Sequence, residues 1–137
     1  MNEVLLNKKA SMDRCILQIK RYYAMNTGLP FESDFLRQDA ICMNLQRICE
    51  LAIDMANHVI RSRKLGLPKD SRDSFTLLRQ ADLIDEEQMN LLQRMVGFRN
   101  VLVHDYQRLD YQIFLDVIDR RLQSLITFAN AMLSATA

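Results

Sequence analysis

A helical hydrophobic stripe in the first half of the chain constrains its fold more than any other feature. Between residues 38 and 64, apolar side chains recur at spacings of three and four residues, with polar side chains on the opposite face. The apolar positions are Ile41, Leu45, Ile48, Ala52, Met55 and Val59. This periodicity is that of an amphipathic α-helix. The pattern therefore predicts a long helix over Gln38–Lys64 whose stripe packs against other helices.

Other segments also repeat apolar residues at helical spacing, and none alternates polar and apolar residues over a useful length. They are Val4–Met25, Ser71–Gln80, the segment that follows Asp85, and a segment from Asp110 to about Leu133. Asp70 or Ser71, Asp85 and Asp110 are the predicted N-caps of the last three. The final segment is apolar over a broad arc, so we expect it to be central in the bundle or shared with a second subunit. Residues 31–37 are expected to form a connector.

Composition narrows the class of protein. Only 3 glycines and 2 prolines occur in 137 residues, which favours one all-α domain over residues 1–137, a bundle of about five helices. The net charge of +1 excludes nucleic-acid binding by the chain as a whole, so any RNA contact needs a local basic patch.

Cys42 and Cys49 lie about 10.5 Å apart along one predicted helix, too far for a disulfide. With no apolar run long enough for a membrane span or signal peptide, a cytoplasmic setting is expected.

Two polar features of the second predicted helix resemble metal or catalytic sites. Glu50 and Asp54 lie four residues apart on one face, but no Glu-x-x-His partner occurs on another segment. We interpret them as a solvated face near Arg47 and Arg61. His58 lies at the edge of the apolar stripe and is expected to be a boundary histidine with a satisfied hydrogen bond. Phosphate-binding, dinucleotide-binding and zinc-protease motifs are absent, so neither a cofactor nor a metal is expected.

The most unusual stretch is Gly97–Tyr106, near the end of the fourth predicted helix. Arg99 falls near the middle of an apolar arc, where an arginine is rarely buried without a partner. Its position is compatible with a snorkelling or salt-bridged arginine, or with a cation held in a cleft or a subunit interface to meet an anion. Asn100 and His104 lie four residues apart on one helical face, so Asn100 could orient the imidazole.

Arg99 and His104 differ by about 140° around a straight helix, so they would not converge on one atom. Two arrangements could bring them together. The helix could end near Val103, which would let His104 swing back. Alternatively, two subunits could face each other across these helices and pool their residues, which would also explain an arginine in an apolar arc.

These residue types suit metal-free cleavage of RNA. A 2′-hydroxyl must lose a proton as it attacks the neighbouring phosphate, and a histidine, whose side chain titrates near neutrality, can accept it or protonate the leaving oxygen. The phosphorane gains charge, which the planar donors of the Arg99 guanidinium can stabilise. Tyr106 can stack on a base or bind a phosphate oxygen.

The eight residues Arg99–Tyr106 (RNVLVHDY) resemble the R-N-x4-6-H motif of HEPN domains, in the R-x4-H-x-Y form found in the toxins of MntA–HepT toxin–antitoxin systems. Every position of the motif is filled. The similarity extends along nearly the whole chain. It includes Leu45–Arg47, Ile53–His58, the Gly66–Pro68 turn and Ser71–Phe75.

The resemblance implies an HEPN-type fold, a homodimer with a composite active site, and a metal-independent endoribonuclease toxin. Arg99 would stabilise the phosphate, His104 would transfer protons and Asn100 would support the site. It also implies a nucleotidyltransferase antitoxin that transfers AMP from ATP to Tyr106. Because an adenylate adds bulk and negative charge beside a phosphate-binding pocket, it would block RNA. The alternatives are a non-catalytic HEPN subunit that positions substrate for a nucleotidyltransferase, and a structural helical dimer without a site; the intact Arg99 and His104 favour the nuclease.

Overall fold

The computed structural model describes residues 2–136, and all regular structure in this range is helical. The α-helices are α1 (Glu3–Ala24), α2 (Phe35–Arg63), α3 (Ser71–Gln80), α4 (Glu86–His104), α5 (Tyr111–Asp116) and α6 (Leu122–Ala135). The 3₁₀ turns η1 (Phe31–Ser33) and η2 (Tyr106–Arg108) and the π-helical segment η3 (Val117–Arg121) complete the order. The predicted all-α bundle is confirmed. No helix in the described range combines the length and hydropathy needed to cross a bilayer.

The aspartates predicted to cap helices do so. Asp70 accepts a hydrogen bond from the backbone N–H of Asp73 (2.8 Å), and Asp110 accepts from the N–H groups of residues 112 and 113. Asp85 and Gln88 form a capping box, in which each side chain binds the other's backbone N–H. These contacts satisfy donors that a helix leaves free in its first turn, so local sequence sets where α3, α4 and α5 begin.

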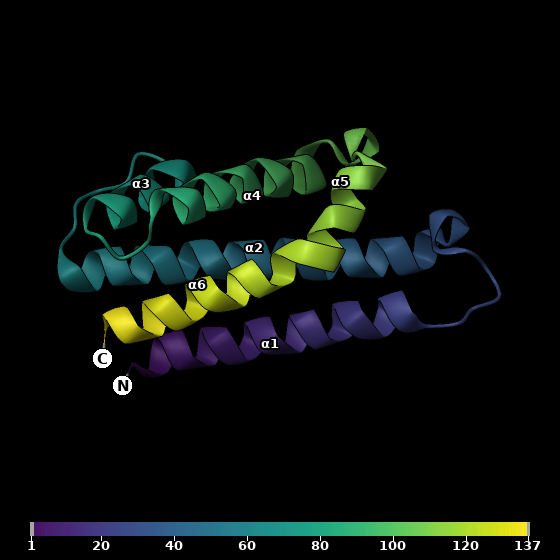
Figure 1. Cartoon of the computed structure of the whole chain (residues 1–137), viewed down its shortest axis with the longest axis horizontal. Coiled ribbons are helices and arrows are strands. Elements are labelled where there is room, and N and C mark those ends of the chain that lie inside the picture. The colour runs from purple at the N-terminus through teal and green to yellow at the C-terminus, as the bar shows by residue number, and fades with distance from the viewer. Residues whose placement is uncertain (1, 137) are drawn as a thin grey trace.

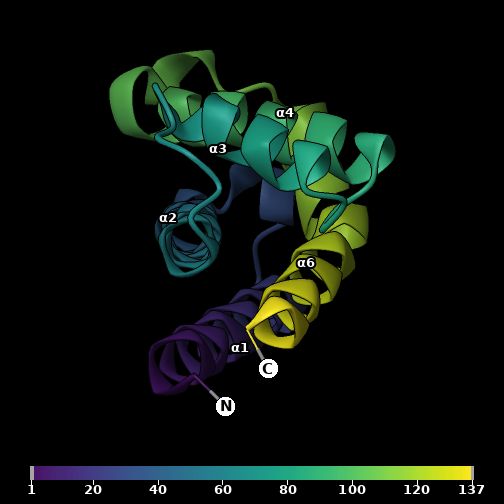
Figure 2. The same ribbon diagram turned by 90° about the vertical axis from the view of Figure 1, so that its left-hand side faces the viewer.

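Helix α2 forms the centre of the bundle. Every residue of its predicted stripe is fully buried, and α2 contacts α1, α3, α4 and α6. Figure 1 shows α3 and α4 on one side of it and α1 and α6 on the other. The end-on view in Figure 2 shows the same two groups separated by α2. The central position is therefore taken by α2 and not by the C-terminal helix, because α2 carries buried residues on more than its one stripe, including Asn44, Cys49 and Ile60. The alternative, in which the C-terminal helix is shared with a second subunit, stays a prediction.

The C-terminal segment is one continuous helical rod that bends at a wider turn inside it, so that α5 and α6 run in different directions (Figure 1). The rod runs through α5, η3 and α6, and Asp116 lies where the α-helical pattern gives way to the π-helical one. The Asp116 carboxylate contacts Arg120 at 3.6 Å and Arg121 at 3.1 Å, and this bracing spans the π turn. A π turn adds a residue to one turn of the helix, which shifts the register of the apolar arc that follows.

Residues 31–37 are not the simple connector that was predicted. They form η1 and the first turn of α2, which begins at Phe35 with Asp34 as its N-cap. The missed feature is Arg37, whose side chain is only 6% exposed. Its guanidinium pairs with Asp34 at 2.8 Å and lies over the Phe31 ring at 5.1 Å. It also donates to the backbone carbonyls of Tyr22, Tyr23, Met25 and Leu29. One side chain thus ties the end of α1 and the loop after it to the start of α2.

Asp34 gives this corner a predicted pH dependence. Hydrogen bonds from Thr27 and then from Arg37 hold the pKa of the Asp34 carboxyl below its ordinary value. A carboxyl whose pKa is lowered by folding contributes stability above its unfolded pKa and loses it as pH falls through the folded pKa. We therefore expect the thermal midpoint to fall on acidification from about pH 5 to 2, and to fall less in Asp34→Asn. Equal slopes for both proteins, measured by circular dichroism, would refute this role.

Candidate functional site

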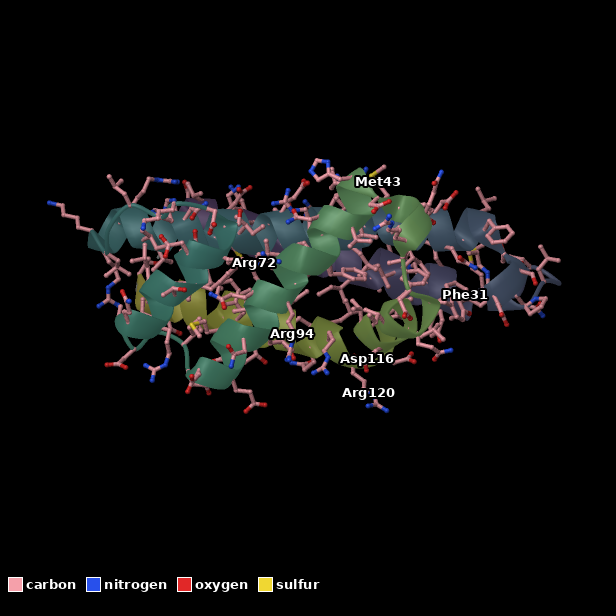
Figure 3. All side chains as sticks on the ribbon, turned by 90° about the horizontal axis from the view of Figure 1, so that it is seen from above. Phe31, Met43, Arg72, Arg94, Asp116 and Arg120 are labelled. Carbon is pink, nitrogen blue, oxygen red and sulfur yellow. The ribbon has the colours of Figure 1, made fainter. Side chains whose placement is uncertain are left out.

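Helix α4 carries Arg99, Asn100 and His104, and a close contact with α3 holds it in place. A Cβ atom at Gly97 would lie 3.0 Å from Nη2 of Arg72, so only glycine leaves room there without a shift. The Gln93 side chain donates to the Arg72 carbonyl (3.0 Å), and Arg72 Nε donates to the Gln93 carbonyl (3.5 Å). Figure 3 labels Arg72 where α3 runs beside α4. Arg72, an exposed cation of α3, therefore lies against α4 at Gly97, two residues before Arg99.

Arg99 projects from α4 toward the interior. Its Nε is buried and has no hydrogen-bond partner within residues 2–136. Burial raises the pKa of the Cys49 thiol on α2 to about 12, and the positive charge of Arg99 opposes that rise. None of the ion pairs in the described range involves Arg99, so the salt-bridged alternative is wrong for the single subunit. A buried, unpaired donor on a cation is costly, and it suits a site that an anion completes.

His104 is the last residue of α4 and is exposed. The backbone N–H of Asp105 donates to the carbonyl of Val101 at 3.0 Å, which closes the final helical turn. Helix α4 therefore ends at His104, one residue after Val103, so the predicted helix end near Val103 is confirmed. His104 itself is still helical, however, and does not fold back toward Arg99 within the subunit. Arg99 and His104 diverge by about 140° on one helix. In the described range Asn100 makes no hydrogen bond to the imidazole, so its supporting role stays a prediction.

Tyr106 lies in η2, directly after α4, and is linked to α2. Its hydroxyl donates to Oδ1 of Asp39 at 2.6 Å, although the two residues are 67 positions apart. The η2 turn is braced by an ion pair between Arg108 and Asp105 at 3.2 Å. Burial and then the hydrogen bond to Asp39 raise the pKa of the Tyr106 phenol. The residue as a whole is nevertheless 42% exposed, so a second protein can contact its side chain.

Two hollows flank the Tyr106 ring and share Asp39. One is lined by Asp39, Cys42, Met43, Gln46, Leu102 and Tyr106. The other is lined by Glu32, Phe35, Gln38, Asp39, Tyr106, Gln107, Leu109, Tyr111 and Phe114. Several apolar side chains are exposed around them, among them Phe35, Met43 and Val103. In Figure 3, Met43 lies at the edge of the molecule beside the end of α4. This surface offers flat apolar groups to a nucleobase or to another protein.

The other polar candidates have structural partners. Asp54 pairs with Lys8 at 3.5 Å and Glu50 accepts a hydrogen bond from Gln46 (3.3 Å), which agrees with the predicted solvated face. His58 Nε2 lies 2.7 Å from the Asn2 amide, which confirms the boundary histidine with a satisfied hydrogen bond. No group of three or more His, Cys, Asp or Glu side chains placed to hold a metal ion occurs in residues 2–136.

An apolar cavity of about 310 Å³ lies elsewhere, where α4 faces α2 and the C-terminal rod. Its polar lining residues are Arg94, Asp116 and Arg121, and none of the four motif residues named above lines it. Figure 3 shows Arg94 and Asp116 near one another, at the edge opposite Met43. Cys49, whose thiol is influenced by the charge of Arg99, also lines the cavity, so the cavity lies next to the motif arginine without including it.

Asp39 is the residue of this site that the sequence did not reveal. It occurs as one of several acidic residues in the long second helix, and no spacing rule connects it to a tyrosine 67 positions later. Only the packing of α4 against α2 brings the two side chains together. Its one sequence signal is its place on the polar side of the helix between the buried residues Arg37 and Ile41.

Together, an all-helical bundle and an Arg-x4-His-x-Tyr motif at the end of α4 define an HEPN-type protein. The family model for HepT-like ribonucleases matches residues 12–132. The chain therefore belongs to the HepT-like ribonuclease family, as the motif predicted.

The relatives agree with this assignment. The chain is 44% identical to the mRNA nuclease HepT of Shewanella oneidensis over 132 residues, which cover 96% of this chain and 98% of that protein. It is similar to the tri-AMPylated HEPN toxin of the same organism, solved in complex with an MNT antitoxin, with a TM-score of 0.90, 43% identity and coverage of 98% and 99%. A toxin–antitoxin structure determined with AMP-PNP gives a TM-score of 0.89, 43% identity and coverage of 96% and 99%. The Bacillus subtilis protein YutE, at 16% identity and a TM-score of 0.74, shares the fold.

Proposed function

We propose that this chain is a metal-independent endoribonuclease, the toxin of a toxin–antitoxin pair, and that it acts in the cytoplasm as a single HEPN domain over residues 1–137. The observation that carries the proposal is the buried, unpaired Nε of Arg99 on the helix that ends with an exposed His104. A guanidinium held without a carboxylate partner suits a phosphate ligand. An exposed imidazole suits proton transfer. The mRNA nuclease relative supports the same activity.

In this mechanism the substrate is RNA and its own 2′-hydroxyl is the nucleophile. His104 accepts the hydroxyl proton or donates one to the leaving oxygen, and Arg99 stabilises the charge that develops on the phosphorane. Asn100 supports the site beside His104. Arg72, exposed on α3 next to α4, adds positive charge that attracts the RNA backbone. No resident cofactor or metal takes part in the proposed steps.

The active unit is a homodimer with a composite cleft. Within one subunit Arg99 and His104 point about 140° apart on α4, so one subunit does not aim both at one phosphate. Two copies with their α4 helices facing across a two-fold axis would bring the arginine of one near the histidine of the other. The exposed apolar residues Met43 and Val103 near the motif suit burial in such an interface.

A nucleotidyltransferase antitoxin silences the toxin by adenylylating Tyr106. Tyr106 is an exposed residue and lies two residues after His104. An adenylate there would add negative charge beside a site that binds a phosphate, and so repel RNA. The complex of the related toxin with an MNT antitoxin, and its tri-AMPylated state, support this control.

The test is a reconstitution with purified components. The wild-type chain alone is expected to cleave RNA in the presence of EDTA. After incubation with the cognate nucleotidyltransferase and ATP, its intact mass should increase by whole adenylate units and cleavage should stop, because the modification blocks the phosphate site. Tyr106→Phe should gain no adenylate and stay active after the same treatment.

Tyr111→Phe is the matched control, since Tyr111 lines the same hollow as Tyr106 outside the motif; it should be modified and silenced like wild type. An inert wild-type chain would refute the nuclease. Adenylates that persist in Tyr106→Phe would refute the site of control.

A further inference from the structure

The hydroxyl of Tyr106 already has a proton acceptor in its own chain. The Tyr106 Oη donates to Oδ1 of Asp39 at 2.6 Å, across the contact between η2 and the second turn of α2. Asp39 is exposed and forms no ion pair within residues 2–136. Its carboxylate is therefore not neutralised by a neighbouring lysine or arginine, and it remains free to take a proton.

The other titratable groups near the phenol suit this task less well. Burial raises the pKa of the Cys42 thiol to about 11, so the thiol stays protonated near neutrality and does not act as a base. Glu32 lines the second of the two hollows beside Tyr106, the one that also includes Phe35 and Tyr111 (the outer hollow), but makes no hydrogen bond to Tyr106 in the described range. Asp105 is occupied by Arg108 at 3.2 Å. His104, two residues before Tyr106, belongs to the proposed nuclease site. Asp39 is thus the titratable group that accepts a hydrogen bond from the phenol hydroxyl.

The phenol itself requires a base. Burial and the hydrogen bond to Asp39 raise the pKa of Tyr106, so the neutral phenol predominates near pH 7. A neutral phenol is a weak nucleophile, and a positioned carboxylate that removes the proton during attack overcomes this weakness. The distance of 2.6 Å lies within the range that direct proton transfer needs.

We propose that Asp39 is the general base for the adenylylation of Tyr106, an inference that rests on the proposed function. The Tyr106 Oη attacks the α-phosphorus of ATP held by the nucleotidyltransferase. The bond between Oη and the α-phosphorus forms, the bond from that phosphorus to the oxygen bridging to the β-phosphate breaks, and pyrophosphate leaves. The phenol proton passes to Oδ1 of Asp39. The toxin thus supplies part of the chemistry of its own silencing.

The product would not keep the starting contact. Once Oη is esterified, Tyr106 has no proton to donate, and the new phosphate carries a negative charge next to the Asp39 carboxylate. Like charges at that distance repel. The modified side chain therefore leaves Asp39, which makes the reverse attack on the adenylate less favourable.

The experiment measures how fast the chain gains its first adenylate, by intact mass, with the cognate nucleotidyltransferase and ATP at several pH values. Asp39→Asn keeps an oxygen that accepts the Tyr106 hydrogen bond but cannot take its proton. Its rate is expected to fall about 100-fold near neutrality and to rise with pH, because hydroxide replaces the missing base, while the wild-type rate levels off. Glu32→Gln, which removes a negative charge from the outer hollow, should gain its first adenylate at the wild-type rate. Asp39 is exposed, so unfolding midpoints should stay close to one another.

Three results would overturn the inference. If the nucleotidyltransferase supplies the base, Asp39→Asn will gain adenylate at the wild-type rate. If Asp39 only positions the ring, the rate will drop by the same factor at every pH and the profile will keep its shape. If the wild-type chain gains no adenylate on Tyr106, the proposed silencing by adenylylation fails, and this inference fails with it. If wild type and Asp39→Asn are modified at equal rates, only the inference about Asp39 fails.

Discussion

Alanine at Arg99 or at His104 is expected to lower RNA cleavage by about two to four orders of magnitude. Loss of His104 removes the group that moves the proton, and loss of Arg99 removes the cation that meets the phosphorane. Both variants should stay folded, because His104 is exposed and the Arg99 Nε has no hydrogen-bond partner in the described range to lose. The measurement is the initial rate of cleavage of a defined RNA, with unfolding midpoints recorded for each protein.

Arg94→Ala is the matched control for charge. Arg94 lies on the same helix but lines the apolar cavity on the other side of α4. Its loss should change the rate less than tenfold, because it removes one charge from the surface and none from the proposed site. A fall as large as that of Arg99→Ala would mean that RNA binding responds to overall charge, and the assigned role of Arg99 would be wrong.

Mixing the two inactive variants tests the composite cleft. If each site takes its arginine from one subunit and its histidine from the other, a dimer of Arg99→Ala with His104→Ala contains one intact site. Random exchange makes half of the dimers mixed, so activity should return to roughly one quarter of wild type. If both residues act within one subunit, the mixed dimer has no intact site and no activity returns.

Arg37→Ala is expected to destabilise the fold by about 3 to 5 kcal/mol, which is a drop in Tm on the order of 10 °C. The side chain is 6% exposed, and its loss leaves the buried carboxylate of Asp34 without its cation and removes a donor from four backbone carbonyls. Breaking a buried pair by removing one partner is costly because the other charge stays buried. Chemical denaturation followed by circular dichroism measures the effect.

Arg63→Ala provides the comparison at the exposed end of the same helix. Arg63 makes only one long hydrogen bond, to the carbonyl of Ala135 at 3.5 Å, so its removal should cost less than about 0.5 kcal/mol. Arg37→Lys should restore only part of the stability, because an ammonium group lacks the planar fork that reaches several carbonyls at once. An Arg37→Ala variant as stable as Arg63→Ala would show that the corner is held by other contacts.

The Arg37 corner also matters for the site. It holds the start of α2, and Asp39 lies two residues after Arg37 on that helix. We therefore infer that the position of the carboxylate beside Tyr106 depends on a charged cluster that ties the end of α1 to α2. The sequence did not reveal this cluster, because the carbonyls that Arg37 binds come from the end of α1 and the loop after it, whose positions depend on tertiary structure.

Where the helices lie could be predicted because the signals are local. The stripe from Ile41 to Val59 is fully buried, and the caps at Asp70, Asp85 and Asp110 bind the N–H groups that follow them. A cap or a periodic stripe acts within one or two turns, so neighbouring residues are enough to recognise it. The start of α2 at Phe35 was missed although Asp34 caps it with a hydrogen bond from the N–H of Arg37, three residues later. The π turn over Val117–Arg121 was missed because no local pattern marks it.

By itself the sequence determined an all-α bundle, its helices and the motif residues Arg99, Asn100, His104 and Tyr106. Only the tertiary structure decided that α2 is central, that the Arg99 Nε is buried without a partner in the described range, and that the Tyr106 hydroxyl donates a hydrogen bond to Asp39. The physical reason is the separation along the chain between the residues that interact. Helix formation depends on residues three and four apart, whereas the environment of a side chain depends on which distant segment packs against it, here α2 against α4.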